Sequence, residues 1–533
     1  MATPGYRQEL FSQLKTDLPA QLPAYLKSQR WFGAKAREVR ATQVFDVIPL
    51  QGEGFEALMA LVNVEYGRGG EDLYSMPLVR FEHGGSSQDA PSPVLRVSDR
   101  RGGGTVEFSD ALKNTGFLSL LLHAIQKGLV FKGEASEFRA TQTSALALLE
   151  TGVAGSLRPR AIKAEQSNSS IAYGDRLMLK FFRRLEEGLN PDLEMSSFLT
   201  EKAHYQNTPQ LMGALEYRSG NGPRMTQGIM QAFAANEGDA WQYTMKAISS
   251  FYNEVAHDSI AGRLTAAQEK SARALIAPFL DSVALLAERT AELHLALASA
   301  PAASDPDFSP EPFDANFQEA FKQALEELTK RVFYQLRKSS ERFPQAARSR
   351  ALEVLGGEDH VRQRFHAALT NPIRAMRTRI HGDYHLGQVL YTGSDFVIID
   401  FEGEPARPMS QRRLKRSPLQ DVAGMLRSFH YAAYAPLLAA TGSVKIHESN
   451  QQNLSAWAEV WAKWVGDHYL AEYLRISDGA AFLPPTRAEI MALLQLQVLE
   501  KAIYELGYEL NNRPDWVAIP LEGISKTLAS SIS

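Results

Sequence analysis

The residues whose types and spacing point most directly to chemistry lie in one stretch, RIHGDYHLGQVLYTGSDFVIIDFEGEPARP, which runs from Arg379 to Pro408. A histidine and a glycine precede Asp383, the amide of Gln388 follows on the same loop, and Asp400 ends an apolar, strand-like run. Phosphoryl transfer needs a carboxylate that receives the acceptor's proton and metal ions that neutralise phosphate charge. Mg²⁺ prefers hard oxygen ligands, which a loop amide and a strand-end carboxylate supply. The order of these residues therefore favours phosphoryl transfer.

Residues upstream supply the complementary parts. QSNSS, Gln166 to Ser170, is a small polar loop between two strand-like runs, and such a loop can offer backbone N–H groups to phosphates. Lys180 stands in the apolar run RLMLKFF, where a lysine is unexpected unless its head reaches a phosphate or a carboxylate. Glu194 lies early in the next helix-like segment and is its candidate partner. A strand lysine paired with a helix glutamate is typical of the nucleotide lobe of kinases.

Each residue also has an ordinary structural interpretation. An Asp in a turn is more often an Asx-turn or N-cap residue, and a lysine on an edge strand is often solvated. An early helix glutamate is commonly favoured by the helix dipole. The functional interpretation is preferred because the residues occur together in the required order. For the cationic run RRLKR, Arg412 to Arg416, we favour a solvated loop over a substrate rim or partner contact.

The elements that must position these residues follow from hydrophobic periodicity. Residues 1–110 alternate like strands and predict a small α/β module, and residues 111–241 predict helices followed by a hairpin-rich sheet. Residues 242–533 are mostly helical, apart from a strand–loop–strand block at 379–401 and a Pro- and Ser-rich, disorder-like stretch at 298–312. These ranges are the three predicted domains.

Composition limits the class of protein. The chain has 533 residues, of which 44% are hydrophobic and 22% charged, with a net charge of -4, so it is typical of a soluble globular protein rather than a nucleic-acid-binding one. It has no cysteine, which excludes disulfides and thiolate chemistry. The N-terminus lacks the pattern of a signal peptide, and no long uncharged apolar run predicts a membrane span. We expect a cytoplasmic protein without membrane or nucleic-acid partners.

Several motifs together resemble the maltokinases, which lie within the larger aminoglycoside-phosphotransferase, protein-kinase-like superfamily. HGDYHLGQVL, IDFEGEPARP and SPLQDVAGMLRSFHYA resemble the phosphotransferase core, and QRWFGAKAREV resembles the maltokinase N-terminal cap. SNSSIAYGDRLMLKFFRRLEEGLNPDLEM resembles the nucleotide lobe, and KAIYELGYELNNRPDWVAIPL resembles the C-terminal helix and tail. The resemblance runs from about residue 20 to about residue 522. It implies an α/β (α+β) bilobal kinase-like fold: a cap, a small antiparallel-sheet nucleotide lobe, and a large helical lobe.

The resemblance also implies roles for individual residues. Asp383 would be the catalytic base and His381 would brace its loop. Gln388 and Asp400 would hold Mg²⁺. The residues expected to bind ATP are Lys180, oriented by Glu194, the phosphate-covering Ser167, Asn168, Ser169 and Ser170, and the adenine hinge near Gln231 and Phe233. The sugar candidates are Glu402, Arg407, Tyr504, Tyr508, Asn512 and Trp516, although Tyr504, Tyr508 and Trp516 also fit simple packing.

The implied activity is ATP-dependent phosphorylation of maltose at its anomeric hydroxyl. Maltose 1-phosphate would feed α-glucan (glycogen) synthesis, and a trehalose synthase is the partner that the family suggests. One alternative keeps the chemistry but changes the acceptor to glucosamine or an aminoglycoside. The other is a non-catalytic regulator of a trehalose synthase, which would have no need for Asp383, Gln388, Asp400 and Lys180 together.

Overall fold

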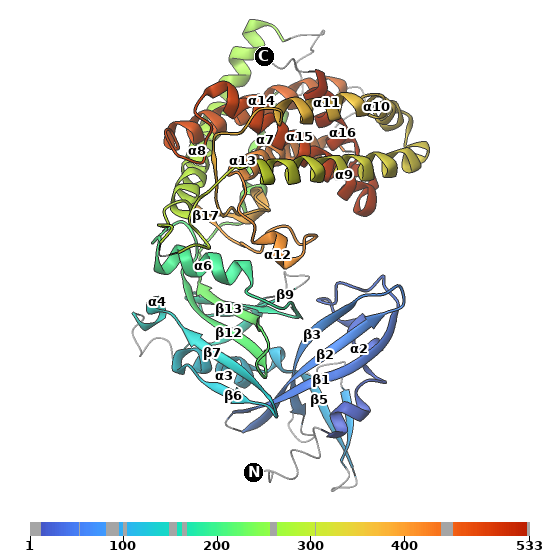
Figure 1. Ribbon diagram of the computed structural model, residues 1–533, viewed down its shortest axis with the longest axis vertical. Coiled ribbons are helices and arrows are strands. Elements are labelled where there is room, and N and C mark those ends of the chain that lie inside the picture. Colours follow the sequence, from blue (N-terminus) through green and yellow to red (C-terminus); the bar gives the residue numbers. More distant parts are fainter. Residues whose placement is uncertain are drawn as a thin grey trace. The chain divides into compact units, whose positions relative to one another are not determined.

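The chain folds into two compact units, residues 1–235 and residues 236–533. Sheets dominate the first unit and helices the second (Figure 1). The computed structural model describes residues 12–52, 54–81, 95–99, 104–148, 157–162, 168–255, 264–303, 305–438 and 451–529.

The first sheet is built from long antiparallel strands in the order β1-β2-β3-β5-β4. Trp31 and Phe32 are buried against Tyr74 in its core. The short strand β11 (Arg184–Leu185) pairs with β3, so a later segment also contributes to this sheet. The elements are α2 (Leu22–Ser28), β1 (Val39–Gly52), β2 (Phe55–Tyr66), β3 (Glu71–Phe81), β4 (Leu95–Asp99) and β5 (Gly104–Asp110).

The second sheet has the order β6-β7-β12-β13-β10-β9-β8, and its strand pairs are antiparallel. A Gly-Asp turn joins β9 to β10, and Gly174 there has a positive φ of 56°. Its elements are β6 (Val130–Lys132), β7 (Ser136–Gln142), β8 (Pro159–Ile162), β9 (Asn168–Tyr173), β10 (Leu177–Phe182), β12 (Leu211–Ser219) and β13 (Arg224–Ala232), with α3 (Thr115–Lys127), α4 (Ser144–Ala147) and α6 (Pro191–Glu201).

Helix α13 (Leu419–Tyr434) is central to the C-terminal unit, because residues on nearly every side of it are buried. It packs against α14 (Gln451–Ile476) and α15 (Arg487–Asn512). Trp457 and Trp461 of α14 are among the largest fully buried side chains. The other helices are α7 (Ala240–Val255), α8 (Ala266–Leu297), α9 (Ala315–Ser339), α10 (Gln345–Gly356), α11 (Glu358–Ala368), α12 (Met409–Arg412) and α16 (Ala518–Ala529).

A two-stranded hairpin interrupts the helices where the sequence predicts strand, loop and strand. It consists of β16 (Val389–Tyr391) and β17 (Phe396–Ile398). The segment that enters this unit is tied to it, because the backbone N–H of Glu237 donates to Tyr391 O at 2.8 Å and that of Tyr391 donates to Gly238 O at 2.9 Å. The rings of Tyr243 and Tyr391 stack at 4.1 Å. The hairpin and the linker segment are thus joined by backbone and ring contacts.

Two expectations about polar segments are wrong. Lys415 of the cationic run is only 6% exposed, and its Nζ donates to Pro306 O at 2.6 Å and to Glu311 Oε1 at 2.7 Å. Arg377 pairs with the same carboxylate at 3.1 Å, beside the short pair of β14 (Glu311–Pro312) and β15 (Met376–Arg377). Composition suggests disorder for 298–312 and solvation for 412–416, but opposite charges fasten these segments together.

Among the described residues, no helix combines the length and the apolar character that a membrane crossing requires.

We expect His430 on α13 to make stability depend on pH. Burial lowers its pKa well below 6.5, and Arg427 and Lys526 lower it further. Below pH 6.5 this histidine binds a proton in the unfolded chain but not in the folded chain. The free energy of unfolding is therefore unaffected above pH 6.5 and decreases as the pH falls, by ~1.4 kcal/mol at pH 5.5. Denaturant titrations between pH 7.5 and 5.5 should show this slope. His430→Gln should reduce it and the exposed control His123→Gln should not; an equal slope in all three proteins would contradict the prediction.

Candidate active site

One buried carboxylate anchors the loop that carries Asp383. Asp421 of α13 accepts the backbone N–H of His381 on Oδ2 at 2.7 Å and that of Gly382 on Oδ1 at 2.9 Å. His294 of α8 lies against the same Oδ2 at 3.2 Å through Nε2, and its Nδ1 lies 2.9 Å from the Tyr473 hydroxyl. Burial acts to raise the pKa of Asp421, but these donors outweigh it and leave the pKa below its ordinary value. The carboxylate therefore stays ionised and fixes the loop.

His381 connects the loop to the end of the hairpin. It is 1% exposed, its Nε2 lies 2.9 Å from Ile399 O, and its Nδ1 lies 3.4 Å from the backbone N of Asp383. Because the carbonyl can only accept, Nε2 carries the proton and Nδ1 is left as an acceptor. This is the arrangement that a bracing histidine would need.

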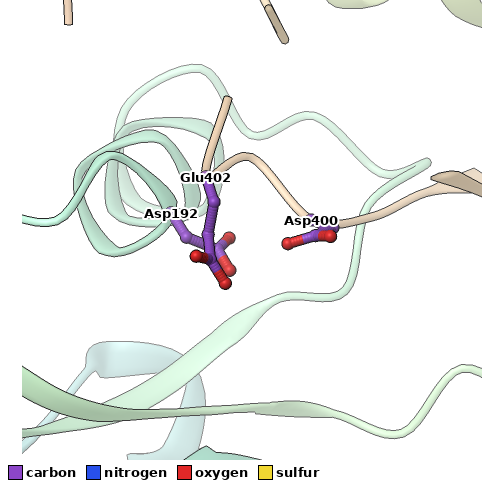
Figure 2. A group of neighbouring side chains, drawn as sticks. All are labelled: Asp192, Asp400 and Glu402. Atoms are coloured by element: carbon purple, nitrogen blue, oxygen red, sulfur yellow. The ribbon is translucent and has the colours of Figure 1, made fainter. Parts of the chain in front are cut away.

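Gln388 and Asp400 lie side by side at the base of the hairpin. The Gln388 Nε2 donates to Asp400 Oδ2 at 3.0 Å, which leaves the amide oxygen as an acceptor. Asp400 has a positive φ of 68°, which is uncommon for a residue other than glycine. Figure 2 draws the carboxylates of Asp400 and Glu402, which lie on the same turn. Hard oxygen donors of this kind fit Mg²⁺.

A second cluster surrounds Asp383 itself. Lys501 of α15 places its Nζ 3.7 Å from Asp383 Oδ1 and 4.0 Å from Glu404 Oε2. Burial acts to lower the pKa of Lys501, but Asp383, Glu404 and Glu505 outweigh it and raise the pKa. Burial, followed by the charge of Asp383, raises the pKa of Glu404, to which Tyr504 is hydrogen bonded. His385 lies with its Nε2 4.0 Å from Asp383 Oδ2. Asp383 thus has an ammonium on one side and an imidazole on the other.

The remaining sugar candidates are Arg407, next to the cluster, and three residues that follow Tyr504 in sequence: Tyr508, Asn512 and Trp516. Arg407 pairs with Glu500 of α15 at 3.9 Å, next to Lys501. Tyr508 is 47% exposed, and the exposed Asn512 donates to its backbone oxygen at 2.8 Å. Trp516 stacks on Tyr431 with ring centroids 6.4 Å apart. Of the residues on α15, Lys501 lies beside Asp383, and Tyr504 is hydrogen bonded to Glu404 in the same cluster. One face of Trp516 is covered by Tyr431.

The nucleotide candidates lie in the N-terminal unit. Lys180 of β10 has its Nζ 3.2 Å from Asp192 Oδ2, and the predicted partner Glu194 lies two residues further along the same helix. The N-cap of α6, Asn190, accepts from the Asp192 backbone N–H at 2.8 Å. Gln231 donates to Ser196 Oγ at 3.1 Å, and the Phe233 backbone N–H donates to Arg176 O at 2.9 Å.

The predicted phosphate loop is only partly a loop. Asn168, Ser169 and Ser170 form the start of β9 opposite the Lys180 strand, and Ser169 Oγ accepts from Arg183 Nε at 2.9 Å. Ser167 lies outside the described residues.

Sequence reasoning missed Lys501, Glu404, Asp192 and the loop anchor Asp421. A signal for Lys501 exists, because Lys501, Tyr504 and Tyr508 recur at the spacing of one helical face. Nothing comparable distinguishes Asp192 from Glu194, since both are acidic residues in the first turn of a helix.

The chain is similar to known proteins in sequence and in fold. Residues 25–112 match the maltokinase N-terminal cap domain and residues 265–443 match the phosphotransferase enzyme family. The glucosamine kinase of Mycolicibacterium smegmatis is 25% identical over 275 residues, which span 51% of this chain and 59% of that protein. A solved glucosamine kinase in complex with glucosamine, ADP and inorganic phosphate superposes with a TM-score of 0.59 at 19% identity, covering 91% of this chain and 93% of its own. Crystal form B of glucosamine kinase gives a TM-score of 0.63 at 18% identity, covering 98% and 99%.

The fold is therefore the mixed α/β kinase-like fold that the motifs predict, with antiparallel sheets in the N-terminal part and a helical C-terminal part. The chain is thus similar to the maltokinase N-terminal cap domain over residues 25–112 and to the phosphotransferase enzyme family over residues 265–443, which confirms the resemblance at the level of these two domains.

We expect Gly424→Ala to lower turnover, because α13 approaches the catalytic loop at this glycine. A Cβ there would lie 2.5 Å from Tyr384 O, which is backbone and cannot move without displacing Asp383. A ten- to hundredfold decrease in kcat is consistent with an ångström-scale misplacement (about 10²-fold). The matched control is Gly356→Ala, where a Cβ meets nothing within 4 Å. Unchanged kcat in Gly424→Ala, measured by ADP release, would contradict the close approach.

Proposed function

We propose that this protein is a kinase that transfers the γ-phosphate of ATP to the anomeric hydroxyl of maltose, giving maltose 1-phosphate and ADP. The observation that carries the proposal is Asp383, a carboxylate on an anchored loop with the Lys501 ammonium 3.7 Å away. A base must be held where the acceptor hydroxyl arrives, and Asp421 provides that support from the buried side.

Asp383 accepts the proton of the acceptor hydroxyl as that oxygen forms its bond to the γ-phosphorus. The bond between the γ-phosphorus and the bridging oxygen of ADP breaks, so atoms and charge balance. When bound, Mg²⁺ would neutralise the phosphates, held by the oxygens of Gln388 and Asp400. Lys180, paired with Asp192, is assigned to the ATP phosphates, and Ser169 and Ser170 to the strand that covers them.

The charges around Asp383 favour a neutral acceptor. Lys501 offsets one of the two negative charges that Asp383 and Glu404 can carry, and it would repel an ammonium on the substrate but not a neutral sugar. Tyr504 and Glu404 offer a hydroxyl and a carboxyl to sugar hydroxyls. Exposed Tyr508 lies one turn beyond Tyr504 and is suited to a second sugar ring. The maltokinase cap match supports the same choice.

The alternative acceptor is glucosamine. The relatives and solved structures named glucosamine kinase favour it, and Glu404 is a carboxylate that an amino group would recognise. We also propose a role in α-glucan synthesis and a trehalose synthase partner, which the resemblance to maltokinases implies. A cytoplasmic location, as the sequence leads us to expect, belongs to the same proposal.

We expect Asp383→Asn to lower kcat by ~10³-fold, because the amide keeps the shape of the base but cannot take the proton. The dissociation constant for ATP, measured by calorimetry, should not change. ADP release should be followed with maltose, glucose, glucosamine, trehalose and kanamycin in parallel. Fast turnover of glucosamine alone would replace the acceptor, and ATP binding without turnover of any sugar would favour the regulatory alternative.

We expect Lys501→Met to lower kcat/KM for maltose by at least tenfold and to decrease it less for glucosamine. The reason is that the repulsion of an ammonium disappears with the lysine, while the contact to a neutral sugar is lost (about 1.4 kcal/mol per factor of ten). The exposed Lys330→Met is the control. Equal losses for the two sugars would contradict a role of Lys501 in choosing between them.

A further inference from the structure

Arg427 lies deep in the C-terminal unit, on the side of α13 that faces α15, and none of the chemistry above uses it. Its side chain is 3% exposed. Its Nε donates to Glu505 Oε2 of α15 at 2.8 Å, and its Nη2 lies 2.7 Å from the same oxygen. A buried arginine bonded to a single carboxylate fixes the relative position of the two helices that carry them.

The surroundings hold the guanidinium in one place. Its Nη1 donates to His430 Nδ1 at 3.3 Å, and the ring of Tyr431 lies 5.6 Å from its centre. On α16, a Cβ at Gly523 would overlap the guanidinium, so the absence of a side chain there makes room for it. Residues of α13, α15 and α16 thus define the position of Arg427, and Glu505 is its partner on α15.

Glu505 carries this constraint to the acceptor cluster. It lies one helical turn after Lys501 on α15, and residues at this spacing share a helix face. Its charge is also one of those that act on Lys501. On the opposite side, α15 packs against α9, where a Cβ at Gly507 would lie 2.9 Å from Val332 Cγ2. With α9 close on one side, the ion pair with Arg427 sets the rotation of α15.

We propose that Arg427 is a positioning residue that acts through Glu505: it sets the rotation of α15 and thereby places Lys501 beside Asp383. The inference rests on the proposed function, because Lys501 matters only if Asp383 receives a sugar. It predicts an effect confined to the acceptor, since ATP binding is assigned to residues that α15 does not carry.

The test uses Arg427→Met, Arg427→Lys and Glu505→Gln in the full chain. Arg427→Met and Glu505→Gln should each lower kcat/KM for maltose about tenfold, a typical coupling within one ion-pair network, while KM for ATP stays within about twofold. The double variant should be no worse than either single one. Arg427→Lys, which keeps the charge, should restore part of the loss. In a Lys501→Met background, Arg427→Met should have no further effect.

The control is Arg364→Met, which removes another buried arginine, one that donates to Leu528 O at 3.2 Å. It should lower the melting temperature but leave kcat/KM for maltose and KM for ATP unchanged. The proposal would be overturned by additive losses in the double variant, by a KM for ATP that changes together with kcat/KM for maltose, or by the same kinetic loss in the control. In each case the Arg427–Glu505 pair would be a structural contact only. If Arg427→Met does not fold, Arg427→Lys and Glu505→Gln carry the same comparison.

Failure of the proposed function would be distinguishable from failure of this inference. If no sugar is phosphorylated, the function fails, and the position of Lys501 is then measured directly. Lysines are ¹³C-methylated, the Lys501 signal is assigned with Lys501→Arg, and its pKa is compared between the unsubstituted chain and Arg427→Met. Loss of the Arg427 cation would by itself raise the pKa of Lys501, so a decrease in Arg427→Met shows that Lys501 has moved away from Asp383 and supports the relay, and an unchanged or raised pKa overturns it.

Discussion

The candidate site depends on one buried charge, the carboxylate of Asp421. A carboxylate removed from water is strongly destabilising unless donors surround it, and here the donors are two consecutive backbone N–H groups of the catalytic loop and the imidazole of His294. The loop conformation and the ionisation of Asp421 therefore require each other. Any arrangement that moved the loop away would leave a charge unsatisfied inside the protein, so a single stable geometry is selected without any substrate present.

Several helices supply the groups that meet this requirement. α8 supplies His294, α14 supplies Tyr473 behind it, and α13 supplies both Asp421 and the glycine that lets the loop approach. A second polar chain braces the other side of Asp383, since the Tyr384 hydroxyl lies 2.8 Å from Thr290 Oγ1, to which Tyr469 also donates. The loop is thus supported on both sides of its carboxylate, while Lys501 approaches from α15.

The sequence predicts what is local. The order of Asp383, Gln388 and Asp400 and the hairpin between the last two follow from spacing and hydrophobic periodicity. It cannot predict which distant charge meets which. Lys501 reaches Asp383 across a long separation in sequence, and Lys180 pairs at 3.2 Å with Asp192, which sequence reasoning did not name. Composition also misjudged residues 298–312, where buried cations overcome a polar, proline-rich sequence.

The hairpin that presents Gln388 and Asp400 is hydrogen bonded to the segment through which the chain arrives from the N-terminal unit. In mechanical terms, the linker is not a free tether. A load applied at residue 237 is borne first by Tyr391 and its strand, and only then by α7. The parts assigned to hold the metal therefore form a continuous, stiff piece with the end of the linker, and the chain's entry into the helical unit is anchored within a few residues of its candidate chemistry.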